Sequence, residues 1–312
     1  MHLDFMVVFS SLMGLFVLIA AGVLIVRLNL VPPEASPYFS ALLIKVAVPC
    51  TIFISLASRE YDPSFVRDSI LTVVTGMVVF PAVHYLGRFL GRLLRIPKGK
   101  RGVWSFSCAY PNAGFMGFPV CLALFGAEGL ALSVIYNIAF NIFVYSIGAM
   151  EIAEDAGAEA ERPGLRKMFF NGINLSIVLS LIFYFCRIPV PEVAAVPITH
   201  LSNITTPLSM LITGMAIGRG RALDLVTDRD AWTASAIRLL GCPLLLLAVL
   251  SLLPYPNRMV VLVTVVIMGM PVPGVTTVLA ETYHGNVDLA AKISFLTNLL
   301  CMVTIPVVCM LL

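Results

Sequence analysis

The sequence predicts an all-α polytopic membrane protein with ten transmembrane helices, built as two inverted five-helix repeats in which helices 4 and 9 are broken crossing helices. Three observations predict this fold: the composition, the lengths of the apolar runs, and matching proline and glycine interruptions in the two halves. Of 312 residues, 59% are hydrophobic and 12% charged, and the mean hydropathy is +0.98. Soluble domains carry about 25% charged residues. The composition therefore excludes an ordinary soluble domain.

The apolar runs have the length of membrane spans. A helix needs about 20 apolar residues to cross roughly 30 Å of hydrocarbon. The first run has no basic segment before it and no small-residue cleavage site after it, so we interpret it as a retained span. Ten runs qualify, at 5–28, 36–57, 66–90, 103–125, 129–150, 170–187, 196–217, 231–253, 258–280 and 287–311.

Lysine and arginine are distributed unequally between alternate loops. One set of loops holds thirteen of them, including the cluster from Arg88 to Arg101, and the other set holds four. Loops rich in lysine and arginine stay in the cytoplasm. The sequence thus predicts a multi-pass protein of the cell (inner) membrane with both termini outside the cytoplasm.

The chain divides into a first repeat over 1–150, a short cytoplasmic linker over 151–168 and a second repeat over 169–312. Five spans per half give the halves opposite orientations. Pro49 in the second span matches Pro207 in the seventh, and the segment from Gly126 matches the segment from Gly285. Such matches in the same order indicate an inverted repeat. The acidic linker is predicted to be solvated, with a docking segment as the alternative.

Two spans are interrupted at corresponding places, over 109–119 and 268–277. Proline removes a backbone donor and displaces the carbonyl four residues earlier. In a membrane the freed groups are tolerated only where they line a cavity or are buried in protein. The resulting half-helix N-termini suit a carboxylate or phosphate. The alternative is that these prolines only bend packed helices.

The candidate substrate-binding residues follow from these breaks. Asn112 comes first because its amide both donates and accepts hydrogen bonds; the alternative is an asparagine that bridges helices. In the second break the matching position is Val272 or Pro273, which leaves two threonine hydroxyls as ligands, or as groups bonded to their own helix. The full set is Tyr110, Pro111, Asn112, Gly114, Pro271, Gly274, Thr276, Thr277, Asn137 and Asn141 on one face of the fifth span, and Lys45 in the second.

Ionisable groups within spans are costly and mark function by default. Those present are Lys45, His84, Arg238 and Lys292, and no carboxylate lies deep in a span. The excess of positive groups favours an anionic substrate. Arg238 and Lys292 are expected to extend to the cytoplasmic interface. His84 and Lys292 are candidates for coupling, since an unperturbed imidazole titrates near neutral pH, although a structural histidine is the alternative.

Catalytic patterns do not compete with this interpretation. The motifs of zinc peptidases, serine hydrolases and phosphate-binding loops are absent from the sequence. We predict no enzyme, no cofactor, no metal site and no nucleic-acid partner. Coupling to H⁺ or Na⁺ stays open, because sodium sites often use backbone carbonyls and hydroxyls. The expected partners are a small organic anion and the lipid bilayer, with a homodimer as an open possibility.

The two interrupted segments resemble those of a known protein family. Pro111-Asn112-Ala113-Gly114-Phe115-Met116-Gly117-Phe118-Pro119 and the later segment from Pro271 through Gly274 to Ala280 resemble the auxin efflux carrier family, which includes plant auxin exporters and bacterial malonate-permease-like proteins. The resemblance implies the fold of bile acid sodium symporters, with a scaffold domain from spans 1, 2, 6 and 7 and a transport domain from the others. It also implies an elevator-like movement and a substrate carboxylate held at Asn112.

Two functions stay open at this point. The first is secondary active transport of small organic anions, mono- or dicarboxylates or auxin-like acids, with the substrate at the crossing of spans 4 and 9 and next to spans 2 and 7. The very short central loop separates this sequence from the plant exporters and favours a carrier of small carboxylates. The alternative is a membrane sensor that binds a small carboxylate without transporting it.

Overall fold

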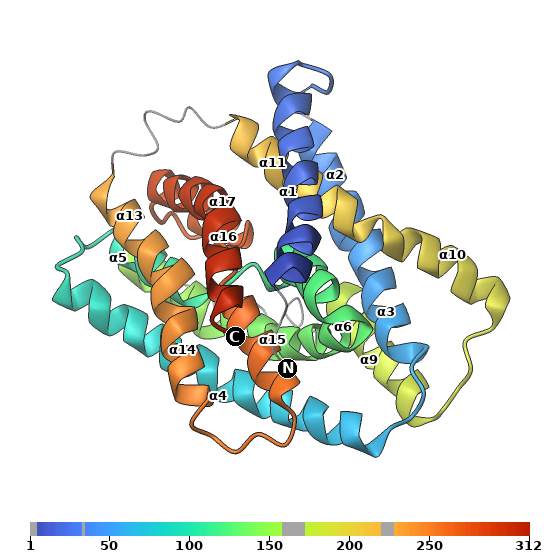
Figure 1. The fold of residues 1–312 in the computed structure, drawn as a ribbon. Coiled ribbons are helices and arrows are strands. Elements are labelled where there is room, and N and C mark those ends of the chain that lie inside the picture. Colours follow the sequence, from blue (N-terminus) through green and yellow to red (C-terminus); the bar gives the residue numbers. More distant parts are fainter. Residues whose placement is uncertain (1–4, 33–34, 158–171, 220–227) are drawn as a thin grey trace.

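The computed structural model describes residues 5–32, 35–157, 172–219 and 228–312, and every regular element in these ranges is a helix (Figure 1). Five helical stretches are long and apolar enough to cross a membrane, and three shorter helices are apolar as well. The chain is therefore an all-helical, polytopic membrane protein. The long stretches are Ser36–Ala57, Pro63–Leu93, Arg101–Asp155, Arg229–Leu250 and Val287–Met310.

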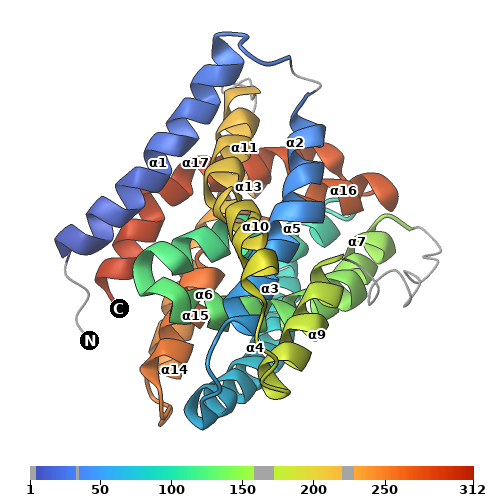
Figure 2. The same ribbon diagram turned by 90° about the vertical axis from the view of Figure 1, so that its right-hand side faces the viewer.

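One group of helices, the first helix group, is built around two close pairings. Helix α1 packs along α11, and α3 packs against α9 and α10; Figures 1 and 2 both show α1 beside α11. Its members are α1 (Phe5–Arg27), α2 (Ser36–Leu42), α3 (Val48–Ala57), α9 (Gly172–Phe185), α10 (Glu192–Asn203) and α11 (Thr205–Arg219).

Glycine permits the contact between α1 and α11. A Cβ atom at Gly22 would lie 2.3 Å from the Leu211 carbonyl oxygen, and one at Gly214 would lie 2.0 Å from the Ile19 carbonyl oxygen. Both distances are far below van der Waals contact. Small residues of this kind let membrane helices pack backbone to backbone.

The second helix group contains the two interrupted segments. Helix α4 packs on α5 and α6, α13 packs on α17, and α14 packs on α15. The group comprises α4 (Pro63–Leu93), α5 (Arg101–Ala109), α6 (Phe118–Phe143), α7 (Ala149–Asp155), α13 (Arg229–Ala236), α14 (Cys242–Leu250), α15 (Arg258–Met268), α16 (Val275–Thr282) and α17 (Val287–Met310). Helix α6 reverses at Gly126, whose φ of 65° suits glycine.

Polar caps fix where helices of the second group begin. Asp62, Asp228 and Asn257 each accept a backbone N–H from the first turn of the helix that follows. Such caps satisfy donors that would otherwise be orphaned. Asn286 does the same for α17.

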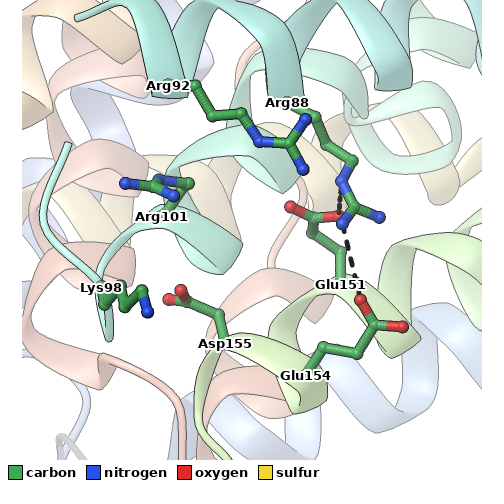
Figure 3. Close-up of a pocket in the computed structure, with 7 residues that line it drawn as sticks. All are labelled: Arg88, Arg92, Lys98, Arg101, Glu151, Glu154 and Asp155. Carbon is green, nitrogen blue, oxygen red and sulfur yellow. Dashed lines mark ion pairs between the residues drawn. The ribbon is translucent and has the colours of Figure 1, made fainter. Parts of the chain in front are cut away.

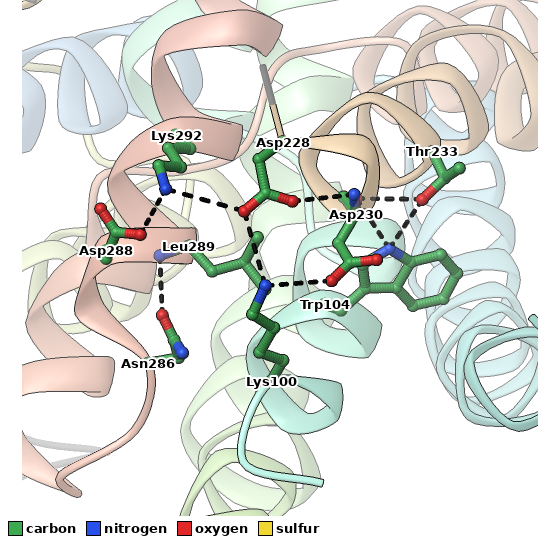
Figure 4. A network of polar contacts seen from close by, with 9 residues as sticks. All are labelled: Lys100, Trp104, Asp228, Asp230, Thr233, Asn286, Asp288, Leu289 and Lys292. Atoms are coloured by element: carbon green, nitrogen blue, oxygen red, sulfur yellow. Dashed lines mark hydrogen bonds and ion pairs between the residues drawn. The ribbon is translucent and has the colours of Figure 1, made fainter. Parts of the chain in front are cut away.

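Polar contacts tie helix ends together at opposite ends of the second group. At one end, here named the basic end, Lys100 contacts Asp228 and Asp230, and Lys292 contacts Asp228 and Asp288 (Figure 4). The basic end also holds the cluster from Arg88 to Arg101. At the other end, the Asn257 amide donates to Asp68 and Glu128.

One helix runs further than the sequence predicts. The span expected to end at residue 150 continues through α7 to Asp155, so Glu151 lies in a helix rather than in a solvated linker. The Glu151 side chain is only 6% exposed, because it packs toward α4 and contacts Arg88. The linker residues 158–168 lie outside the described residues.

Candidate substrate site at the two helix breaks

Both expected interruptions are present as helix breaks. Helix α5 ends at Ala109, Tyr110 is extended with φ of −107° and ψ of 122°, and a π-helical turn over Ala113–Gly117 leads into α6. Helix α15 ends at Met268, and α16 begins at Val275 after a non-helical stretch. Prolines in both breaks lack the N–H that would continue a helix. The local sequence therefore determines both interruptions.

The two breaks contact each other directly. The Asn112 N–H donates to the Pro271 carbonyl over 2.7 Å. The next N–H of the second break, on Val272, donates to the Thr297 hydroxyl of α17 over 3.2 Å. These bonds satisfy backbone groups that lipid cannot satisfy.

Arg238 holds the ends of the two helices that enter the breaks. Its side chain is fully buried and donates to the carbonyls of Cys108 (3.0 Å), Met270 (3.2 Å) and Met268. Helix C-termini carry partial negative charge, so α5 and α15 together compensate the guanidinium. The expectation that Arg238 extends to the interface is wrong, because carbonyls freed by the breaks attract it inward.

A cavity of about 440 Å³ lies beside the breaks. Its walls are the π-helical turn after Asn112, the start of α16, helix α6 and the first helix group. Five predicted residues meet there: Asn112, Gly114, Asn137, Asn141 and Gly274. The other lining residues are Ser40, Ile44, Val48, Phe115, Phe118, Phe140, Tyr145, Ile173, Pro273, Val275 and Val278.

Helix N-termini give this cavity its electrostatic character. The described residues that line it include no lysine, arginine, aspartate or glutamate. Two helices begin at its wall, one after Asn112 and the other after Gly274. Their N-termini carry partial positive charge and free N–H groups, which suit a small anion.

The orientation of the Asn112 side chain is set by its own helix. The Asn112 side-chain oxygen accepts the Phe115 N–H over 3.2 Å. Because a backbone N–H can only donate, the oxygen must occupy that position and the amide nitrogen the other. Asn112 lines the cavity and is 9% exposed. Its NH₂ group is thus the side-chain donor that the first break offers to an anion.

The two asparagines of α6 lie on the cavity wall and differ in their contacts. Asn141 donates to the side-chain oxygen of Asn174 in α9 over 3.1 Å, which joins the second helix group to the first. Asn137 lines the cavity with 3% of its surface exposed. The wall formed by the first helix group comes from the predicted second span and from α9, and no described residue of 196–217 lines it.

Other predicted residues of the breaks do not line the cavity. Pro111 and Pro271 are buried at the crossing itself, and the Tyr110 hydroxyl lies beside His84 instead. The Thr276 hydroxyl is buried without a hydrogen-bond partner among the described residues. The Thr277 hydroxyl donates to the Gly274 carbonyl over 2.9 Å, the bond to its own helix that the sequence left open.

The predicted cations lie away from the cavity. Lys45 is exposed on the outer face of its helix. Lys292 is at the basic end, in ion pairs with Asp228 and Asp288. Arg238 and Glu151 are the buried charged residues whose positions sequence reasoning missed. The only signal in the sequence was position: Arg238 lies about two turns inside the predicted span 231–253, and Glu151 directly follows the predicted span 129–150.

An all-helical membrane protein in which two broken helices meet beside a cavity has the architecture of a membrane transporter. Residues 7–309 match the model of the membrane transport protein family, and the chain belongs to that family. This confirms the resemblance found from the interrupted segments, and the protein is a transporter rather than an enzyme.

Three relatives are similar over nearly their whole length. An uncharacterized transporter of Methanothermobacter thermautotrophicus is 27% identical, with 95% of this chain and 96% of the relative covered. An uncharacterized transporter of Methanocaldococcus jannaschii is 24% identical over 90% and 91% of the two chains. A Rhizobium meliloti protein named "Putative malonate transporter" is 26% identical over 93% and 91%.

Proposed function

We propose that the protein is a secondary active transporter of small organic anions, with mono- and dicarboxylates such as malonate as the substrate class. The observation that carries the proposal is the 440 Å³ cavity at the crossing, where two helix N-termini and the Asn112 amide converge. Partial positive charge without a fixed cation suits an anion that must be bound and then released. The name of the Rhizobium meliloti relative supports the same class.

The proposal includes ten membrane spans in two inverted repeats, 1–150 and 169–312. Two features support it. The breaks occupy corresponding places and bond to each other through Asn112 and Pro271. Polar contacts between helix ends also occur at both ends of the second group. Asn257 contacts Asp68 at one end, and Lys100 contacts Asp228 at the other. We further propose that the basic end faces the cytoplasm, which places both termini outside.

The proposed mechanism is an elevator movement of the second helix group against the first. The cavity lies between the two groups, since Ile44 and Val48 come from one and Asn112 and Val275 from the other. A substrate bound there would be carried with Asn112 while the first group stays fixed. The bond between Asn141 and Asn174 would break and reform during such a movement.

The test is flux through the purified protein in proteoliposomes. We expect saturable uptake of labelled malonate, exchange with unlabelled malonate on the other side, and competition by other small carboxylates, with indole-3-acetate included in the panel. Protein-free liposomes give the background. Saturable binding without uptake or exchange would instead identify the alternative, a non-transporting sensor.

A further inference from the structure

Three buried titratable side chains form a chain beside the crossing, outside the cavity. The Tyr110 hydroxyl lies 3.3 Å from Nδ1 of His84, and Nε2 of His84 lies 3.7 Å from a carboxylate oxygen of Glu151. Tyr110 is fully buried, His84 is 1% exposed and Glu151 is 6% exposed. They come from α5, α4 and α7, so the fold brings them together.

This chain connects the crossing with the basic end. Tyr110 directly precedes Pro111 and Asn112, which form the first break. At the other end, Glu151 lines a cavity of about 260 Å³ that opens at the basic end (Figure 3). The cavity is lined by Arg88, Arg92, Lys98, Arg101, Glu151, Glu154 and Asp155.

We propose that His84 and Glu151 form a proton-binding site that couples proton movement to anion transport, with Tyr110 linking this site to the crossing. The inference rests on the proposed function. Imidazole and carboxylate are the side chains that most often carry protons in transporters. A proton that enters from one side of the membrane binds the carboxylate or imidazole. After the proposed elevator movement it is released from the same two groups to the other side, together with the anion.

Charge balance explains why such a site helps an anion carrier. The substrate brings negative charge to the buried crossing, and one proton at His84 or Glu151 offsets part of it. Tyr110 transmits the change because it is the extended residue that joins the end of α5 to Pro111 and Asn112. A Cβ atom at Gly148 would lie 2.8 Å from the Tyr110 ring, so the helix that carries Glu151 packs tightly on that ring.

Charges of both signs surround the site, so they do not fix it in one protonation state. Arg88 lies 3.0 Å from Glu151 and 3.6 Å from the more exposed Glu154, so one arginine is shared between two carboxylates. The groups that face His84 are Tyr85, Arg88, Tyr110 and Glu151. The groups that face Glu151 are His84, Arg88, Arg92, Tyr110, Glu154 and Asp155.

The test separates proton-driven accumulation from simple exchange. Proteoliposomes are given a proton gradient with the membrane potential clamped, and malonate uptake is compared with malonate exchange at equal pH. One coupled proton supports about tenfold accumulation for each pH unit. We expect His84→Gln and Glu151→Gln to lose this accumulation but to keep exchange, since both retain hydrogen-bonding groups of similar size.

Matched controls are available on the same chain. His200→Gln changes an exposed histidine of α10, and Glu192→Gln changes an exposed carboxylate in the first turn of the same helix. Both should accumulate malonate as the unmodified protein does. Accumulation that persists in His84→Gln and Glu151→Gln would overturn the inference.

A second measurement on the unmodified protein covers the case in which a variant does not fold. In weakly buffered detergent solution with a pH indicator, malonate binding should take up about one proton per malonate if one site is coupled. Binding without proton uptake, or flux that ignores the proton gradient, would overturn the inference and leave the proposed function standing. Absence of flux, exchange and binding would instead overturn the proposed function itself.

Discussion

The Asn112 N–H donates to the Pro271 carbonyl over 2.7 Å, across 159 positions of sequence. Each residue belongs to a different helix break, so neither break is satisfied alone. Unpaired backbone groups within a membrane cost several kcal/mol each. The bond therefore makes the two interruptions one structural unit, and the cavity beside them depends on both halves of the chain.

Asn112 has two separable roles, a cap for its own helix and a donor to the cavity. Aspartate is as good a helix cap as asparagine, but it replaces the NH₂ donors with negative charge. We expect Asn112→Asp to keep its melting temperature within a few degrees and to lose malonate uptake by at least about tenfold, equivalent to roughly 1.4 kcal/mol of anion binding. Uptake in proteoliposomes and thermal unfolding in detergent measure the two roles.

Asn286→Asp is the matched control, because the Asn286 side-chain oxygen also caps a helix, α17, but lies at the basic end and not on the cavity wall. Uptake by Asn112→Asp equal to that of the unmodified protein would remove the amide from the site.

Arg238 should act mainly on stability. Its planar guanidinium reaches three carbonyls at once, and a lysine ammonium cannot reproduce that fork. Each lost hydrogen bond to a charged group costs about 1.5–3 kcal/mol. We expect Arg238→Lys to lower the melting temperature clearly and Arg238→Met to lower it further. Arg67→Lys, at a side chain that is 52% exposed, should change it little.

The positions of the breaks were predictable because proline and glycine act locally. Pro111 and Pro271 lack the N–H that continues a helix, and glycines lie close to each of them. The proposed inverted repeat would explain why the two breaks meet. Asn112 was predictable as a cavity residue for the same reason. The coarse class, an all-helical polytopic membrane protein, followed from composition and run length alone.

Side-chain partners across the fold were not predictable. Arg238 was expected at the interface because its distance from the span end allowed it, and only the structure shows which carbonyls the breaks leave free. Glu151 was assigned to a solvated linker because acidic residues follow it. Its burial depends on the packing of α7 against α5 and on the contact with Arg88 of α4, which no local pattern encodes.

The ion pairs at the basic end should make stability depend on pH. Burial acts to raise the pKa of Asp228, but the Asp230 N–H and Lys100 outweigh it, and the pKa lies below its usual range. A carboxyl of this kind stabilises the fold above its unfolded pKa, and the stabilisation is lost as the pH falls through the folded value. The stabilisation by Asp228 is therefore lost at acidic pH.

We expect Asp228→Asn to melt slightly below the unmodified protein near neutral pH, by about 0.5–1 kcal/mol of stability. Asparagine keeps the cap of α13, so only the charge is removed. The difference should shrink as the pH falls below about 4 and vanish only once it has passed through the lowered pKa of Asp228, where the folded aspartate is protonated as well. Melting curves in detergent from acidic to neutral pH measure it, and a difference that stays constant throughout would show that charge is not its origin.

Close packing of α1 on α11 gives a last prediction, which concerns the first helix group. A Cβ atom at Gly22 would meet the Leu211 carbonyl oxygen at 2.3 Å, so Gly22→Ala must push the two helices apart. Gly14 lies on the same helix with no neighbouring atom within 4 Å. Alanine favours a helix by about 1 kcal/mol over glycine at either place. Gly14→Ala should therefore keep or raise the melting temperature, whereas Gly22→Ala should lower it. Equal effects of the two substitutions would mean that α1 and α11 do not pack backbone to backbone.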